Sequence, residues 1–250
     1  MILSRLHPIE EAVRSRPEEI EWVLLDSQRR DRRLAELARL CRARGVPLRY
    51  GDREALDRLA RGNQGAVART AVRGYASEEE ALEGDAGRRL VIVLDGVEDP
   101  QNLGAVLRVA DGVGAGVILP ERGSAPLSEA VARSSAGAVE RVRIARVGNL
   151  RRLLDRLKEQ GFRVVGLEAA GTDLYRVDLT GDLVLVLGAE GRGMRRLVRE
   201  GCDVVARLPM RGKLASLNVA TAAAAAAYEA VRQRDFSGRP EDSGGRPGNP

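Results

Sequence analysis

The chain has 250 residues, 44% of them hydrophobic, which is enough to bury the core of one large or two modest domains. Its formal net charge of +5 favours polyanionic partners. Cys41 and Cys202 stand far apart and His7 is the only histidine, so the composition excludes a disulfide framework, a zinc ligand set and the Ser-His and Cys-His nucleophile pairs. Any catalysis must therefore use arginine, lysine, carboxylate or hydroxyl groups.

The basic residues are unevenly distributed. Only Lys158 and Lys213 are lysines, which leaves 39 arginines, and a GC-rich genome explains that bias as well as a functional need does. Residues 1–72 hold 15 arginines against 11 acidic residues, so most of the positive excess lies in the first third. A nucleic-acid contact is thus expected there first.

No segment is expected to enter a membrane. The apolar runs are strand-sized, and the alanine run 222–227 is far shorter than the roughly 18 residues of a membrane span. Glu10 and Glu11 precede any apolar stretch, which fits neither a secretory signal nor a transit peptide. We expect a cytoplasmic protein without a metal centre.

The first 72 residues predict a small α/β domain. Apolar spacing indicates helices over 5–16, 30–44 and 55–60, and strands over 22–25, 46–48 and 66–72. Between the last helix and strand lies Gly62-Asn-Gln-Gly65, which is either a phosphate-contacting loop or a plain turn.

Three further segments complete the expected organisation. Residues 73–88 are acidic and glycine-containing and are interpreted as a linker. Residues 89–236 form the second domain, and the Gly- and Pro-rich residues 237–250 are expected to be disordered.

The second domain alternates buried strands with helices, which predicts a parallel sheet covered on both faces. Strands are expected over 90–94, 116–119, 140–144, 163–167, 183–187 and 204–208, and helices over 103–112, 127–135, 149–160, 194–200 and 218–234. Ligands of such sheets bind beyond the carboxyl ends of the strands. Three loops at those ends carry unusual residues.

The first loop runs from Asp95 to Arg108. Asn102 is placed to cap the following helix, and Arg108 falls on a helix face with the small residues Gly104, Ala105 and Gly112. That face leaves room for a substrate or a second subunit. A plain cap and a solvated arginine are the alternative.

The second loop is Gly188-Ala-Glu-Gly-Arg-Gly193, directly after a strand. It matches neither a Walker loop nor a dinucleotide fingerprint, which disfavours ATP and NAD. Its glycines permit close backbone approach, and the carboxylate of Glu190 calls for a cationic partner, for which Arg108 is one candidate.

The third loop, Leu208 to Asn218, is too rich in special residues for a simple connection. It contains Pro209, Gly212 and Lys213 and closes with Ser216-Leu-Asn218 before an alanine-rich helix. Ser216 and Asn218 can cap that helix. This excess of proline, glycine and polar residues over what a simple connection needs indicates that a ligand binds here.

In this order the three loops resemble the motifs of the SpoU (TrmH-type) branch of the SPOUT RNA methyltransferases. The matching segments are Asn-Leu-Gly-Ala-x-x-Arg at 102–108, Gly-x-Glu-Gly-x-Gly at 188–193, and Leu-Pro-Met…Ser-Leu-Asn at 208–218; Ser135-Ala-Gly-Ala138 matches another family segment. Residues 1–72, with His7-Pro8, Glu11-Ala12 and Gln64-Gly65, resemble the ribosomal-protein-like substrate-binding domain of the 23S rRNA guanosine 2'-O-methyltransferase subfamily. Relatives often have a histidine where Asn63 stands.

The resemblance implies a trefoil-knotted catalytic domain, bound S-adenosylmethionine, and a homodimer whose active site takes residues from both subunits. It implies a catalytic set and a set of cofactor-binding residues. The catalytic residues are Asn102, Arg108, Glu190, Ser216 and Asn218, and the cofactor-binding residues are Leu167, Gly188, Gly191, Leu208, Met210 and Leu217.

The implied reaction is attack by a ribose 2'-hydroxyl, in 23S rRNA, on the methyl group of the cofactor. Because guanidinium stays protonated, we interpret Arg108 as a fixed cation that stabilises the developing alkoxide rather than as a base. Three alternatives remain: a tRNA 2'-O-methyltransferase, a catalytically inactive RNA-binding protein, and a nucleotide-dependent oxidoreductase.

Overall fold

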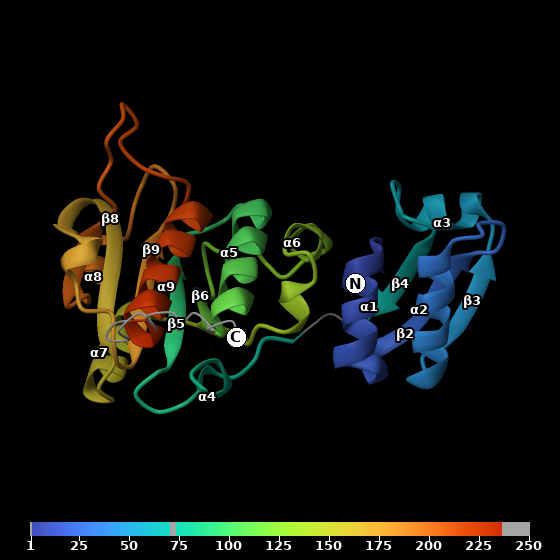
Figure 1. Cartoon of the computed structure of the whole chain (residues 1–250), viewed down its shortest axis with the longest axis horizontal. Helices are drawn as coiled ribbons and strands as arrows, with labels where there is room; N and C mark the ends of the chain where they lie inside the picture. The colour runs from blue at the N-terminus through green and yellow to red at the C-terminus, as the bar shows by residue number, and fades with distance from the viewer. Residues whose placement is uncertain (1, 71–73, 237–250) are drawn as a thin grey trace, which may run out of the picture.

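The computed structural model describes residues 2–70 and 74–236, whose strands form a four-stranded and a six-stranded sheet. Figure 1 shows the first sheet and its helices on one side of the molecule and the second on the other, with α1 facing α6 between them. The predicted tail at 237–250 lies outside the described residues, as do 71–73 of the predicted last strand and linker.

The first sheet has the strand order β1-β4-β2-β3, in which only β2 and β3 are parallel. Helices α1 and α2 cover one face. Helix α3 covers the other, where its Leu56 packs with Trp22 and Leu24 of β2. The elements are β1 (Ile2–Leu3), α1 (Leu6–Ser15), β2 (Ile20–Asp26), α2 (Arg32–Ala43), β3 (Leu48–Gly51), α3 (Arg53–Leu59) and β4 (Ala66–Thr70), with a short 3-10 helix η1 (Pro17–Glu19).

The small α/β domain matches the prediction apart from two strands. β1 is too short to show a pattern, and the strand predicted at 46–48 lies at Leu48–Gly51 because Val46 and Pro47 lead into it. The loop at Gly62–Gly65 is a turn held by hydrogen bonds within it and to α1. Asn63 Oδ1 accepts from Gly65 N at 3.0 Å, and Gln64 Oε1 accepts from Leu6 N at 3.1 Å.

The second sheet is parallel throughout, as predicted, with the order β10-β8-β9-β5-β6-β7. Its elements are α4 (Glu78–Ala81), β5 (Leu90–Asp95), α5 (Pro100–Val113), β6 (Gly116–Pro120), α6 (Glu129–Ser134), η2 (Ala138–Glu140), β7 (Ile144–Val147), α7 (Leu150–Glu159), β8 (Arg163–Asp173), η3 (Leu174–Arg176), β9 (Leu183–Gly188), α8 (Arg196–Glu200), β10 (Val204–Arg207) and α9 (Val219–Asp235). β5 lies inside the sheet between β9 and β6, and its loop is therefore central.

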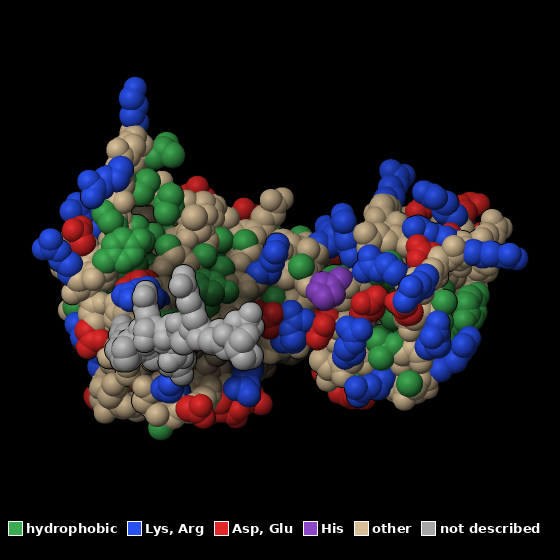
Figure 2. All heavy atoms as spheres, in the orientation of Figure 1, with side chains coloured by type: hydrophobic (Ala, Val, Ile, Leu, Met, Phe, Trp, Pro, Cys, Tyr) green, Lys and Arg blue, Asp and Glu red, His purple; other side chains and the backbone are tan. Residues whose placement is uncertain are grey.

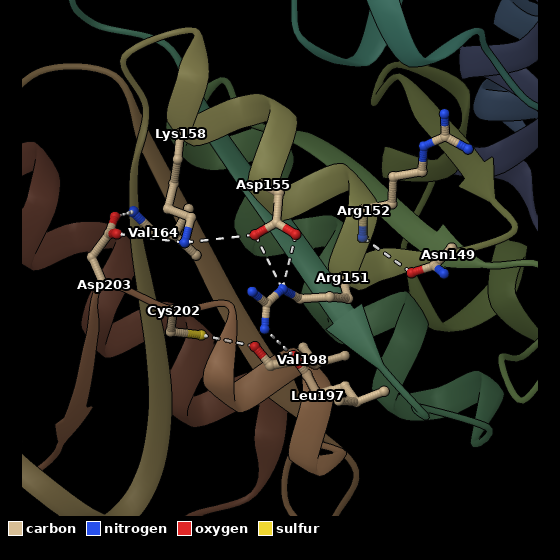
Figure 3. Close-up of polar contacts among 10 residues, drawn as sticks. All are labelled: Asn149, Arg151, Arg152, Asp155, Lys158, Val164, Leu197, Val198, Cys202 and Asp203. Atoms are coloured by element: carbon tan, nitrogen blue, oxygen red, sulfur yellow. Dashed lines mark hydrogen bonds and ion pairs between the residues drawn. The ribbon is translucent and has the colours of Figure 1, made fainter.

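Alternate side chains of the buried strands point to opposite faces. Leu90, Ile92 and Leu94 pack with α5, α6 and α9, whereas Val91 and Val93 pack with α4 and α7. Figure 3 shows the polar contacts of α7 and α8, which lie on the same face of the sheet as Val91 and Val93. Arg151 Nε donates to Asp155 within α7 at 2.9 Å, and Arg151 Nη1 donates to Leu197 O of α8 at 3.5 Å.

Three predicted elements of the second domain differ in the structure. The strand predicted at 140–144 begins only at Ile144, because residues 138–140 form η2 after a left-handed Gly137. α5 begins at Pro100 rather than 103. β8 continues past Leu167 to Asp173, where Thr172 and Asp173 pair with the end of β10 after a register shift.

Residues 74–88, part of the predicted linker, pack against the second sheet. Ala76 forms a bridge with Ala145, Ser77 and Glu80 cap α4 reciprocally, and Arg156 Nη2 donates to Glu78 at 2.5 Å. The acidic run is thus a capped helix whose charge meets an arginine of α7, which composition alone did not indicate.

Within residues 2–70 and 74–236, the helices are all too short or too polar to cross a bilayer. The same residues contain no cluster of three or more side chains suited to holding a metal ion. Burial raises the pKa of Cys41 to about 11 and that of Cys202 to about 12, so neither thiol supplies a thiolate near neutral pH.

Candidate active site

The three loops identified in the sequence meet at one edge of the parallel sheet. They follow β5, β9 and β10, whose carboxyl ends point the same way. Figure 1 shows the orange-red segment between β10 and α9 projecting above this edge. Figure 2 shows basic side chains at its tip, where Arg211 and Lys213 are exposed.

A chain of hydrogen bonds joins the three loops through their side chains. Asn102 Nδ2 donates to Glu190 Oε2 at 3.4 Å, and Asn218 Nδ2 donates to Asn102 Oδ1 at 2.8 Å. Asn218 Oδ1 in turn accepts from Ala220 N at 2.9 Å, which caps α9. Asn218 therefore serves the helix and the site with different atoms.

The expected capping role of Asn102 is wrong. Asp99 caps α5 by accepting from Gln101 N at 2.9 Å, and Pro100 occupies the first helical position. Asn102 consequently lies in the first turn, where its amide is free to bridge Glu190 and Asn218.

The pairing of Glu190 with Arg108, one candidate that the sequence offered, does not form within the chain. Among the ion pairs of the described residues, none includes either side chain, and Glu190 is exposed, so its carboxylate is solvated and needs no counter-charge. Arg108 is exposed on α5. Its guanidinium is left open toward solvent.

The glycine loop after β9 closes tightly on itself. A Cβ at Gly188 would lie 2.1 Å from the carbonyl carbon of Gly193, and Gly193 N donates to Ala189 O at 2.9 Å. Gly191 and Gly193 have φ values of 78° and 68°, which side chains disfavour. The glycines are thus required by the backbone itself.

Asp95 anchors this loop, and the sequence reasoning missed it. Its side chain is fully buried at the end of β5 and accepts from Arg195 N and Arg195 Nε, both at 2.7 Å. A carboxylate ending an otherwise apolar strand was the available signal. Asp95 therefore fixes the exit of the glycine loop relative to β5.

A pocket of about 380 Å³ opens between the second and third loops, within the roughly 300–1,000 Å³ typical of small-molecule sites. It is lined by all six residues expected to bind a cofactor, together with Glu190 and Ser216. Asn102, Arg108 and Asn218 are not among its lining residues. The expected cofactor set and part of the expected catalytic set are thereby brought together.

The extension of β8 adds a pocket wall that sequence reasoning did not foresee. Glu168, Ala169 and Ala170 line the pocket next to Leu167, and Arg199 Nε lies 3.0 Å from Glu168 Oε2. The predicted strand ended at 167, so these residues appeared to belong to an ordinary loop.

Comparison with known proteins identifies the fold and its relatives. Residues 89–228 match the model of the SpoU rRNA Methylase family. The chain belongs to this family. Residues 6–76 match the model for RNA 2'-O ribose methyltransferase substrate binding, which agrees with the resemblance of the first domain.

Individual members of the SpoU family are similar over most of the chain. The 23S rRNA (guanosine-2'-O-)-methyltransferase RlmB of Pseudomonas aeruginosa is 43% identical over 235 residues, covering 92% of this chain and 95% of that protein. The SpoU methyltransferase AviRb of Streptomyces viridochromogenes, solved with AdoMet, has a TM-score of 0.78 at 27% identity and covers 96% of this chain and 91% of AviRb.

A tRNA-modifying member is similar over a smaller part. The A. aeolicus TrmH/SpoU tRNA modifying enzyme has a TM-score of 0.53 at 30% identity, and the match covers 59% of this chain and 77% of that enzyme. The A. aeolicus enzyme thus matches a smaller part of this chain than RlmB and AviRb do.

Proposed function

We propose that this protein transfers the methyl group of S-adenosylmethionine to the 2'-hydroxyl of a guanosine ribose in 23S rRNA. The observation that carries the proposal is that the second and third family motifs line one pocket, while Asn102 of the first motif is hydrogen-bonded to Glu190 of the second and Asn218 of the third. The curated relative with that activity matches nearly the full length of the chain.

The pocket fits S-adenosylmethionine, which supplies an activated methyl group on a sulfonium. Apolar walls from Leu167, Leu208 and Leu217 would hold its adenosine part, and Met210 lies beside them. The backbone of Gly188 and Gly191 is bare of side chains and would contact it closely. AviRb, with the same fold, binds this cofactor.

The polar side chains at the pocket mouth orient the attacking ribose. Asn102, held between Glu190 and Asn218, cannot rotate without breaking a hydrogen bond, so its position is fixed before the RNA arrives. Ser216 lines the pocket and offers a hydroxyl toward the ribose. Positioning is the main task because the methyl donor is already activated.

Arg108 supplies positive charge for the oxygen that loses its proton. Its exposed guanidinium has no acidic partner within the described residues, so it keeps its charge for a phosphate and the developing alkoxide. Because Arg108 does not line the pocket of its own chain, we propose that it acts on the pocket of a second subunit in a homodimer.

The substrate is assigned to rRNA through the first domain. Residues 1–72 bind RNA in this proposal, and residues 89–236 carry the chemistry. The tRNA-modifying relative covers only 59% of the chain, whereas the rRNA enzyme covers 92%. We propose that the first domain is the part that distinguishes the two substrates.

The test combines binding with mapping. Calorimetry with S-adenosylmethionine is expected to show binding to the full chain, and 2'-O-methyl mapping of rRNA from a deletion strain is expected to show one lost guanosine methylation in 23S rRNA. A lost tRNA methylation would replace the substrate assignment. Absence of cofactor binding would favour an inactive RNA-binding protein instead.

A further inference from the structure

The turn after α6, Ser135-Ala-Gly-Ala138, contacts the first domain. It matches a family segment but has no role in the proposed chemistry. Ala136 and Gly137 have φ values of 51° and 90°, so the chain reverses tightly there. A Cβ on Gly137 would lie 3.4 Å from Glu11 Cβ and 3.8 Å from His7 Cδ2. Helix α1 therefore rests directly on the bare backbone of this turn.

The same turn presents a buried charge to the first domain. Arg16, at the end of α1, is only 7% exposed, and the Glu140 side chain in η2 is fully buried. Arg16 Nη2 forms an ion pair with Glu140, and Arg16 Nη1 pairs with Glu19 in its own domain. Figure 2 shows acidic and basic side chains gathered beside the histidine where the two parts meet.

Two further contacts surround this pair. Arg141 bridges the parts, because its Nη1 lies 3.0 Å from Glu11 while its Nε and Nη2 donate to Asp111 of α5 at 2.8 and 2.6 Å. Ser4 Oγ donates to Glu129 of α6 at 3.2 Å. Apolar side chains of α1 and of η2 belong to one continuous core.

The residues at this contact also pack against the candidate active site. Ser134 Oγ donates to Pro100 O at 3.0 Å, and a Cβ on Gly104 would lie 1.9 Å from that hydroxyl oxygen. Pro100 and Gly104 flank Asn102 in the first turns of α5. The turn that receives α1 therefore also packs against the turn that positions Asn102.

We propose that residues 134–141 form a docking seat that holds the first domain in a fixed orientation, with the Arg16–Glu140 pair as its buried lock. RNA gripped by the first domain is then delivered in one geometry to the methyl-transfer loops. Without these contacts the first domain would not be held in one orientation. The statement about RNA delivery rests on the proposed function; the docking itself does not.

Charge reversal in the full-length protein tests the lock. Arg16→Glu places a carboxylate against Glu140, and Glu140→Arg places a guanidinium against Arg16; each is expected to shift the docked-to-undocked ratio by roughly a hundredfold or more. The double variant R16E/E140R restores opposite charges across the seat. Small-angle X-ray scattering is expected to show a larger radius of gyration for each single variant and recovery in the double.

Arg39→Glu is the matched control. Arg39 lies in α2 of the same domain and undergoes the same charge change, but its side chain is exposed and it forms no ion pair among the described residues. Its radius of gyration should equal that of the unmodified protein. Glu140→Gln, which keeps the side-chain shape, serves if a reversal prevents folding, and a smaller opening is expected.

Methylation kinetics give the second readout. For the single reversals we expect unchanged affinity for S-adenosylmethionine and a fall of about tenfold or more in kcat/KM for RNA, with recovery in the double variant. Single variants that keep both the compact radius and full RNA turnover would overturn the proposal. If even the unmodified protein fails to methylate RNA, the proposed function fails, while scattering still decides whether the seat exists.

Discussion

Asn218 combines two duties at the residue scale. Its Oδ1 caps α9 and its Nδ2 donates to Asn102, so helix stability and active-site geometry are carried by different atoms of one amide. Asparagine meets both needs, whereas the carboxylate of aspartate would meet only the first. The same site leaves Arg108 open to solvent, without an ion pair among the described residues.

Asn218→Asp separates the two duties. Aspartate is an equally good cap, so the free energy of unfolding should stay within about 0.5 kcal/mol, but it cannot donate to Asn102 Oδ1, and kcat should fall by at least about tenfold. Asn218→Ala should lose kcat and also about 1 kcal/mol of stability. Denaturant unfolding and methyl-transfer assays measure both quantities. Full activity in Asn218→Asp would show that this hydrogen bond is dispensable.

Arg108→Lys tests whether a fixed cation acts in catalysis. Lysine keeps the charge but lacks the planar fork, so kcat should fall on the order of a hundredfold while cofactor affinity stays unchanged. The pH profile should keep its shape. Near-full activity with a profile shifted to lower pH would instead indicate a titrating base, since lysine, with an ordinary pKa of about 10.4, loses its proton more readily than arginine.

At the element scale, α5 depends on how closely α6 approaches it. Gly104 is buried under Ser134, and Gly112, two turns later, faces only the hydroxyl end of Tyr228, whose side chain is largely exposed. Helix propensity alone would favour alanine at both positions, because glycine destabilises a helix interior by roughly 1 kcal/mol. At Gly104, the close approach of Ser134 makes alanine unfavourable instead.

Gly104→Ala is expected to lower the free energy of unfolding by about 1–3 kcal/mol, because its methyl group would overlap Ser134 Oγ and the backbone of Ser135. Gly112→Ala is the control: the Tyr228 hydroxyl can move aside, and the variant should be unchanged or up to about 1 kcal/mol more stable. Urea unfolding at one protein concentration compares the two. Equal effects would contradict this account of the α5–α6 contact.

Elements with strong local signals were predicted well. The buried strands at 90–94 and 183–187 and the helix at 149–160 lie within a residue or two of their expected bounds, because their apolar spacing is long and regular. η2 and the end of β8 were not predicted. Each depends on a partner elsewhere in the chain: η2 packs on α1, and residues 172–173 pair with β10.

At the scale of the whole molecule, the basic first domain and the second domain meet through a buried ion pair rather than a tether alone. Docking and the proposed RNA binding therefore involve the same domain. The trefoil knot and the homodimer implied by the family resemblance remain predictions.

Deletion of residues 1–72 should leave affinity for S-adenosylmethionine within about threefold, because all pocket residues lie at 167–222. RNA methylation should be lost, since the arginine-rich domain is the expected site of phosphate contacts, and the steep salt dependence of RNA binding should weaken with it. Calorimetry and a filter-binding assay measure the two effects. Unchanged turnover would show that RNA methylation does not require the first domain.

The sequence by itself determined the parallel sheet and the three loops, because strand ends and glycine-rich turns leave local patterns, and the resemblance to the SpoU family indicated six cofactor-binding residues that line the pocket. Only the tertiary structure decided that Asp99 caps α5 and frees Asn102, that Asp95 anchors the glycine loop, and that Glu168 lines the pocket. It also placed Arg16 against Glu140. These are long-range pairings or choices between equally good local partners, and no residue pattern along the chain distinguishes them.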